Sequence, residues 1–359
     1  MLTFNEMAKC LQSNVINDFP DDFEIADELK TEFSESEIRL GVKALSGLLY
    51  QLFDVIIDNA NTIAPPDKKL DVMGWPEKIY VDLRNPFALL YCTGLHGKYD
   101  YDSKCLLING KELNKIYRKA RGKKTDDFIK LLIDSGLVYS TDVKDNKSFN
   151  IAKSGIVKVH YPDDDHTIIG LKILSEAISK VKGGAIVEHF MRCDYRILSL
   201  PKKYIFDIRD VTKFLPADER DYYIELHELL LSNNCKMETK PDSFIFNYNS
   251  KSTKLKVASI HIMTTGCFVK LSSKLISKEP DLLFDAPESI KDAIKAGHEC
   301  AKKENPDACN PKCIGKIIGF NLDGVDYLKC WHLNFYLPTT GDIERNYIKE
   351  WIIKEAASS

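Results

Sequence analysis

The residues with the clearest chemical potential are four of the ten cysteines, which lie close together near the carboxyl end. They are Cys300, Cys309, Cys313 and Cys330. Cys309 and Cys313 flank Asn-Pro-Lys, a sequence typical of a tight turn, on which two thiolates can point at one ion. Zinc prefers four nitrogen or sulfur ligands at tetrahedral corners. The spacing therefore predicts a structural zinc site made of these four side chains.

Two other interpretations of the cysteines stay open, because eight residues separate Cys300 from Cys309 and zinc ligands are usually closer in sequence. Cysteine is among the most buried residue types, so the four can be ordinary reduced core residues. They can also serve redox chemistry or form a disulfide. His298 and His332 are near enough in sequence to replace one thiolate. A closed zinc site would explain stability and not activity, because it leaves no position for a substrate.

A second candidate is a run of seven lysines and arginines from Lys111 to Lys124, in which Glu112 is the only acidic residue. Such a run on a helix and its exit loop can bind the phosphates of a nucleic acid. The helix expected next carries Asp126, Asp127 and Asp134, however, and these carboxylates would repel DNA. We therefore interpret the run mainly as a solvated helix face and do not predict nucleic acid as the principal partner.

Acid–base groups occur at two further places. Asp163, Asp164 and Asp165 precede His166, and His189 follows Glu188. Such groups can transfer protons or hold hard metal ions. Carboxylates at the start of a helix are also stabilised by the helix dipole alone, which is the simpler interpretation of the aspartates. These residues form the basis of an alternative hypothesis, an enzyme of unrecognised type with a pocket between the two halves of the chain.

Composition and charge narrow the class of protein. The chain has 359 residues, of which 44% are hydrophobic and 29% charged, and this predicts a folded protein of more than one domain. A net charge of −3 gives no general attraction to nucleic acid or to an anionic membrane. We expect no secretion signal and no membrane-spanning segment. Ten cysteines then indicate a reducing compartment, and we expect the protein to be cytoplasmic.

The amino-terminal half is predicted to be mainly helical. Residues 1–105 contain a capping box, Ser34 with Glu37, before an apolar stripe that ends at Ile57. A short strand is expected over 78–82. In 106–185 the pattern predicts two helices, 111–120 and 125–135, which Gly122 and Gly136 end, and a hairpin of 137–141 with 149–151. This order resembles a winged helix-turn-helix. Residues 186–215 are expected to bridge the halves.

Residues 216–359 are predicted to form an α+β domain. A helix over 216–232 precedes strands over 243–248, 255–263 and 267–271. A second helix over 287–302 leads to a hairpin of 316–322 with 325–337, turned by Asp323 and Gly324. A final helix covers 342–356. Four aromatic residues of the strands can line a cavity or simply pack in the sheet: Phe244, Phe246, Tyr248 and Phe268.

The sequence as a whole favours a non-catalytic binding or regulatory protein. The winged-helix-like half would contact a macromolecule, and the α+β domain would bind a small molecule or a protein. No phosphate-binding glycine loop or serine-nucleophile motif is present in the sequence. Convergent polar groups with shifted pKa values in a deep cleft would favour the enzyme hypothesis. An apolar pocket on the sheet with few titratable groups would favour a binding protein.

Overall fold

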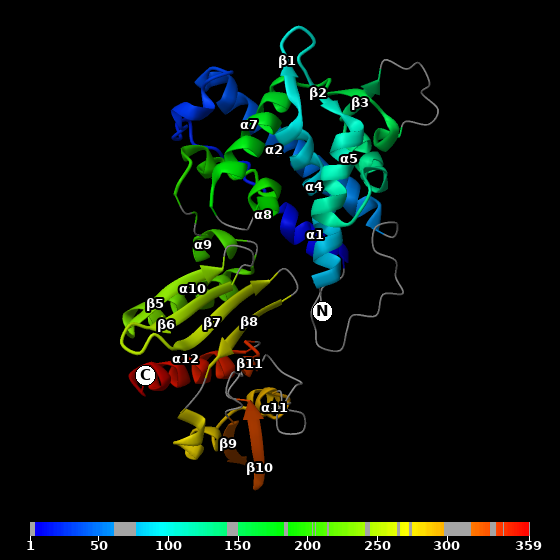
Figure 1. Ribbon diagram of the computed structural model, residues 1–359. Helices are drawn as coiled ribbons and strands as arrows, with labels where there is room; N and C mark the ends of the chain where they lie inside the picture. Colours follow the sequence, from blue (N-terminus) through cyan, green and yellow to red (C-terminus); the bar gives the residue numbers. More distant parts are fainter. Residues whose placement is uncertain are drawn as a thin grey trace. The chain divides into compact units, whose positions relative to one another are not determined.

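The computed structural model of the chain describes residues 4–60, 77–141, 150–182, 186–202, 204, 206–213, 215–240, 245–263, 266–272, 275–297, 317–330, 335–339 and 341–358. The chain divides into two compact units, residues 1–204 and 205–359 (Figure 1). Both units combine helices with antiparallel sheets. The predicted α+β class is therefore confirmed.

Four long segments form the helical core of the first unit. They are α1 Phe4–Gln12, α2 Glu35–Asp58, α4 Glu77–His96 and α7 His166–Lys180. The predicted capping box starts α2, because the Ser34 hydroxyl accepts from the Glu37 N–H and the Glu37 carboxylate accepts from the Ser34 N–H. Helices α2 and α7 touch at Gly41 and Gly170, where a Cβ atom on either glycine would overlap the other backbone. The strand expected over 78–82 is wrong, because these residues belong to α4.

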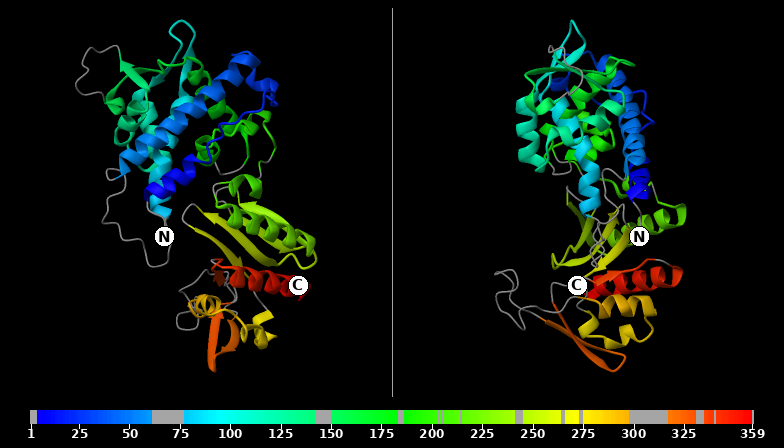
Figure 2. Two further views of the ribbon diagram at one scale, coloured as in Figure 1. Left: turned by 180° about the vertical axis from the view of Figure 1, so that it is seen from behind. Right: turned by 90° about the vertical axis from the view of Figure 1, so that its right-hand side faces the viewer.

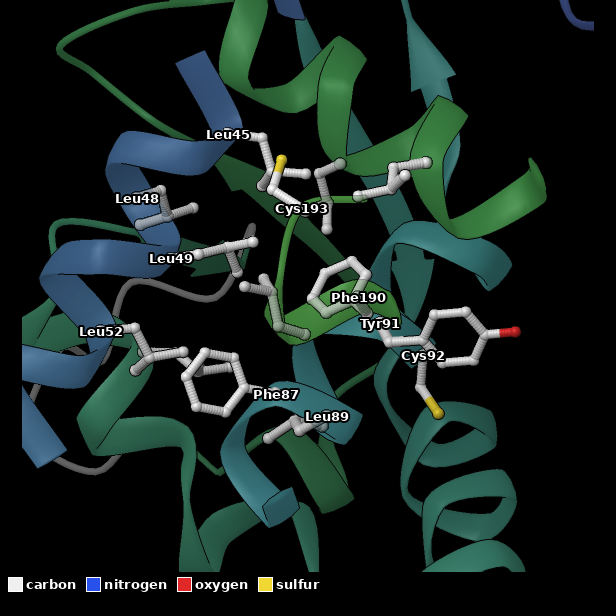
Figure 3. Close-up of a cluster of buried hydrophobic side chains, with 14 of the residues drawn as sticks. Leu45, Leu48, Leu49, Leu52, Phe87, Leu89, Tyr91, Cys92, Phe190 and Cys193 are labelled. Atoms are coloured by element: carbon white, nitrogen blue, oxygen red, sulfur yellow. The ribbon is translucent and has the colours of Figure 1, made fainter. Parts of the chain in front are cut away.

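By length and hydropathy alone, α2 is the one helix among the described residues that could cross a membrane. Most of its apolar side chains, however, lie inside the first unit, and Leu40 is an exposed exception. Leu45, Leu49 and Leu52 are completely buried, and Figure 3 shows them facing Phe87 of α4 and Phe190. The apolar stripe of this helix is thus used for core packing.

A four-stranded sheet, two α-helices and two short 3-10 helices complete the central part of the first unit. The 3-10 helices are labelled η. The elements of this part are β1 Lys98–Asp100, β2 Cys105–Asn109, α5 Gly110–Arg121, η2 Thr125–Asp127, α6 Ile129–Asp134, β3 Val138–Thr141, η3 Ile151–Lys153 and β4 Ile156–His160. The strand order is β1-β2-β4-β3, and all pairs are antiparallel. Gly122 and Gly136 end the two helical segments with positive φ, as predicted. The second hairpin strand lies at β4. The prediction of 149–151 is wrong where the structure describes it, since Ile151 begins η3, and residue 149 lies outside the described residues. The unit ends with α8 Ile186–Met191 and η4 Tyr195–Ser199.

The second unit is built on a five-stranded antiparallel sheet of order β11-β8-β7-β6-β5. Its strands are β5 Cys235–Lys240, β6 Ile245–Ser250, β7 Lys256–Met263, β8 Gly266–Leu271 and β11 Phe335–Leu337. Its helices are α9 Ile208–Val211, α10 Ala217–Ser232, η5 Leu275–Ser277, η6 Pro280–Leu283, α11 Glu288–Lys295 and α12 Asp342–Ser358. Strands β9 Ile317–Leu322 and β10 Val325–Cys330 form a separate hairpin, turned at Asp323 and Gly324 as predicted.

The carboxyl-terminal strand differs from its prediction. Residues 325–337 were expected to form one strand, but β10 ends at Cys330 and pairs with β9, whereas β11 starts at Phe335 and pairs with β8. The two segments therefore belong to different sheets. Strand β5 is an addition to the predicted set, and it places a fifth strand beside β6.

One face of the five-stranded sheet is covered by helices. Phe246, Ile260, Val269 and Leu337 are aligned across the strands on this face, and all four are completely buried. The neighbouring Tyr248 hydroxyl lies 2.7 Å from Nδ1 of His227 in α10. In Figure 1 helix α10 lies behind the strands, and in the view from behind in Figure 2 it lies in front of them. We call this side the core face.

Candidate functional site

The other side of the same sheet carries a row of polar residues, one from each of its five strands. The register aligns Glu238, Asn247, Ser259, Lys270 and Tyr336 in that order from β5 to β11. Alternation along each strand places these residues opposite the core face. Together with His261 and Phe268, which are paired on the same side, we call this surface the polar sheet face.

Three polar side chains of this face are buried. Asn247 is 8% exposed, His261 is 3% exposed and Ser259 is completely inaccessible. Burying a polar group without a hydrogen bond costs free energy. The hydroxyl of Ser259 and Nε2 of His261 satisfy each other at 2.9 Å. The centre of the polar sheet face is therefore an ordered polar cluster.

Aromatic rings lie beside this cluster. The His261 ring stacks on Phe268 with centroids 4.5 Å apart and an interplanar angle of 22°. Tyr336 lies 5.2 Å from Phe268, and 41% of it is exposed. The ammonium group of Lys270 lies 4.9 Å from the centre of the Tyr336 ring. Burial raises the pKa of the Tyr336 hydroxyl, so this group stays a neutral hydrogen-bond donor at physiological pH.

This arrangement offers two kinds of interaction to a ligand. Phe268 and Tyr336 supply ring surface for stacking, and Lys270 supplies a charged hydrogen-bond donor beside Tyr336. Sites for small organic molecules typically combine aromatic walls with a few placed polar groups. The face can therefore bind a flat polar molecule. The Ser259–His261 pair is also the kind of contact that activates a serine nucleophile, but this serine is inaccessible.

The predicted zinc site cannot be assembled from the described residues. Cys300, Cys309 and Cys313 lie outside them, as do His298 and His332. Cys330 is buried at the end of β10, opposite Ile317. Within the described part of the chain, no three His, Cys, Asp or Glu side chains are grouped so that they could hold a metal ion. Zinc binding by the four cysteines stays a prediction.

The predicted basic run lies on α5 and the loop that follows it. Six of its seven positive charges are exposed, and the seventh, Arg121, is partly buried. Its Nε donates to Asn85 at 3.1 Å, and burial lowers the pKa of its guanidinium group. Lys115 lies 3.8 Å from Glu112. The run is thus an exposed basic ridge with one structural member.

The predicted acidic run and His166 lie together in the first unit. His166 Nδ1 lies 2.9 Å from a carboxylate oxygen of Asp164, and Lys104 pairs with Asp165 at 2.9 Å. They line a pocket of about 370 Å³. Its other walls come from Glu37, Tyr99, Pro162, Asp163 and Ile169. Because Asp164 and Asp165 are already paired with His166 and Lys104, we interpret this group as the ordinary start of helix α7.

His189 belongs to a different group. Its Nδ1 lies 3.1 Å from Asp194, which is completely buried, and Arg196 donates to the same carboxylate at 2.7 Å. Burial alone would raise the pKa of Asp194, but the hydrogen bonds from His189 and Arg196 outweigh it and hold that pKa well below its usual range. Tyr204 packs edge-on against His189 at 4.4 Å. This network stabilises the end of the first unit and does not join the acidic run.

The aromatic residues singled out from the strands fall on opposite sides of the sheet. Phe246 belongs to the core face with Tyr248, whereas Phe268 belongs to the polar sheet face; Phe244 lies outside the described residues. No sequence motif pointed to Asn247, Ser259, His261, Lys270 or Tyr336. The signal that could have found them is the alternation of β7, where Ser259 and His261 interrupt a run of apolar residues.

Comparison of the chain with protein-family models, with curated proteins and with solved structures found no match. Its function is therefore argued from the surfaces described above.

Proposed function

We propose that this chain is a non-catalytic binding protein whose polar sheet face holds a planar, conjugated small molecule. The proposal is carried by one observation: a polar row across all five strands lies beside the stacked rings of His261 and Phe268. An ordinary solvent-facing sheet surface needs neither a buried Ser–His pair nor a continuous ring surface.

Each part of the face has a distinct role in this proposal. The ring of the ligand stacks on Phe268 and Tyr336, an interaction that contributes about 1–3 kcal/mol per ring where it has been measured for nucleobases. The Lys270 ammonium group lies beside Tyr336 and favours a ligand with an anionic substituent.

The test uses quinoline-2-carboxylate, a flat anion, and cyclohexanecarboxylate, its saturated counterpart. Saturation-transfer NMR and calorimetry should detect binding of the flat anion only. Phe268→Ala should weaken it by roughly five- to 150-fold, the equivalent of one stacking contact. Tyr327→Ala is the matched control, because Tyr327 stacks on Phe320 at 5.6 Å in the separate β9–β10 hairpin. Equal binding of both anions, or no binding of either, would overturn the proposal.

The enzyme hypothesis makes a different prediction for the same face. If Ser259 were a nucleophile activated by His261, a fluorophosphonate probe should label the chain, and Ser259→Ala should abolish labelling. We expect no labelling, because Ser259 is completely buried. Labelling at Ser259 would replace the binding proposal with an acyl-transfer or hydrolase function.

A second candidate function rests on the first unit. Helices α5 and α6 precede the β3–β4 hairpin, and β2 pairs with β4 to give the order β2-β4-β3. This connectivity supports the predicted resemblance to a winged helix-turn-helix, a module that contacts macromolecules. The exposed basic ridge of α5 favours a polyanion, whereas Asp127 and Asp134 on and beside α6 disfavour insertion into a DNA groove.

We therefore propose that α5 contacts nucleic-acid phosphates without reading the base sequence. Binding in a mobility-shift titration should be weak, independent of sequence and steeply reduced by salt. The charge reversal Lys115→Glu with Lys119→Glu should abolish it. The same double reversal at Lys278 and Lys349, in the second unit, is the control. No shift at low salt would remove nucleic acid as a partner and leave the ridge as a solvated face.

Structural zinc at the four cysteines is retained as a third, separate proposal. Elemental analysis of protein purified without added metal should give close to one equivalent of zinc. Cys309→Ser with Cys313→Ser should lose it, and Cys92→Ser, on a buried cysteine of α4, should not. Fully folded protein that contains no metal would contradict the proposed zinc site.

A further inference from the structure

A pocket of about 420 Å³ lies in the second unit, between α12 and the segment around η6. Positions 343, 346, 347, 350, 351 and 354 of α12 follow helical spacing and form one wall. The opposite wall comes from Asp281, Leu282, Asp285 and Pro287. None of these residues belongs to the polar sheet face or to any site considered above.

Two aromatic rings give this pocket a defined wall. Tyr347 and Trp351 lie one helical turn apart with centroids separated by 5.9 Å in an edge-on arrangement. The Tyr347 hydroxyl donates to the backbone carbonyl of Leu282, on the opposite wall. Trp351 is 1% exposed and anchored in the core beneath the pocket. The rings are therefore held in place before any ligand arrives.

Negative charge dominates the rest of the pocket. Asp281, Asp285 and Glu350 contribute three carboxylates, and Lys354 contributes one positive charge, so the pocket carries a net charge of −2 at neutral pH. Within the part of the chain that the structure describes, none of these three carboxylates accepts a hydrogen bond or forms an ion pair. Burial raises the pKa of Tyr347 to about 12, and Asp285 and Glu350 add to this rise because both lie close to the ring.

We propose that this pocket binds an organic cation, either an alkylammonium or a guanidinium group. The partly exposed Tyr347 ring can attract such a cation through its electron-rich face, and carboxylates at the rim add Coulomb attraction. The cation can belong to a free amine or to a lysine or arginine side chain of a polypeptide. The shared chemistry is a soft positive charge that can contact rings.

The experiment compares choline with 3,3-dimethylbutan-1-ol, its neutral isostere, by calorimetry on the full chain. Choline should bind in the millimolar range, and the isostere at least tenfold more weakly. Asp285→Asn and Glu350→Gln should each weaken choline binding about threefold, whereas Lys354→Gln should strengthen it about threefold. Glu279→Gln is the control, because Glu279 is exposed on the same segment but does not line the pocket.

Equal binding of choline and the isostere, or an affinity for choline that stays unchanged in all three pocket variants, would overturn the proposal. Thermal melts of each variant report folding separately, and these side chains are exposed, so the amide variants should keep the wild-type midpoint. A second arm replaces choline with acetyl-lysine-amide and acetyl-arginine-amide. Tighter binding of these assigns the pocket to a polypeptide side chain, and tighter binding of choline assigns it to a free amine; both outcomes support the proposal. Quinoline-2-carboxylate binding should be unchanged in every variant, so the two sites fail independently.

Discussion

The two faces of the five-stranded sheet use alternate residues of the same strands for opposite purposes. The core face aligns Phe246, Ile260 and Val269 beneath α10 and α12, and these side chains are completely inaccessible. The polar sheet face aligns Asn247, Ser259 and Lys270 at the adjoining positions. One residue along any of these strands therefore separates a position on the core face from a position on the polar sheet face.

The contrast shows how one sheet can carry a polar row on one side without weakening the core on its other side. Apolar burial on the helix side supplies most of the stability, since each fully buried large apolar side chain contributes about 1.5–3 kcal/mol. The other side can then carry groups that contribute little to folding. Adjacent residues on one strand should accordingly respond very differently to substitution.

The largest effect is expected at Phe335, next to Tyr336 on β11. Phe335 is completely buried and lies 6.5 Å from the Trp351 ring, so Phe335→Ala should lower the free energy of unfolding by about 3–5 kcal/mol. Tyr336→Ala removes a ring that is 41% exposed and should cost less than about 1 kcal/mol. Urea titration of both variants measures the difference. Similar losses would show that the two faces are not distinct.

The next effect concerns the buried hydrogen bond between His227 and Tyr248. Tyr248→Phe leaves His227 without this partner on the core face and should cost about 1–3 kcal/mol. It should leave the affinity for quinoline-2-carboxylate unchanged, because the hydroxyl faces away from the polar sheet face. Calorimetric binding and thermal unfolding of one preparation give both values. A change in affinity with unchanged stability would reverse the assignment of the faces.

The pH dependence of stability should reflect the buried histidine that contacts the core face, His227. Burial lowers the pKa of His227, so the folded protein binds its proton less readily than the unfolded chain. Stability should therefore be greatest above the ordinary histidine pKa, about 6.5, and should decrease as the pH falls below it. His227→Asn should flatten this decrease in urea titrations between pH 7 and pH 5. An unchanged slope would assign the decrease to other groups.

The smallest effect is expected at Glu238, the exposed end of the polar row. Its carboxylate accepts from the Asn249 side chain at 3.1 Å, and Glu238→Gln keeps an acceptor in place, so stability should change by less than about 0.5 kcal/mol. Removing the negative charge should strengthen quinoline-2-carboxylate binding by about twofold or less. Weaker binding would indicate that Glu238 contacts the ligand directly.

Much of the secondary structure follows from local signals, and the exceptions have identifiable causes. The Ser34 capping box, the Gly122 and Gly136 helix ends and the Asp323–Gly324 turn act through neighbouring residues, so the sequence predicts them correctly. The segment 78–82 contains β-favouring residues but continues into an apolar stripe of α4 that includes Leu83, Phe87 and Leu90. Tertiary packing of this stripe determines the helix, which local propensity cannot reveal.

Only the alternation within each strand of the polar sheet face could be predicted from the sequence. Alternation in β7 and β8 shows which residues share a side of each strand, but the row depends on the register of four strand pairs. Tyr336 joins it because β11 pairs with β8, more than 60 residues earlier in the sequence. A single-residue shift of that pair would place Tyr336 on the core face. Such long-range register is not encoded in any local motif.

The central claim is that a planar ligand lies on the polar sheet face, and intermolecular NOE measurement tests it most directly. With quinoline-2-carboxylate bound, its ring protons should give NOEs to the ring protons of Phe268 and Tyr336. NOEs to residues of another surface, such as Tyr347, would contradict the account.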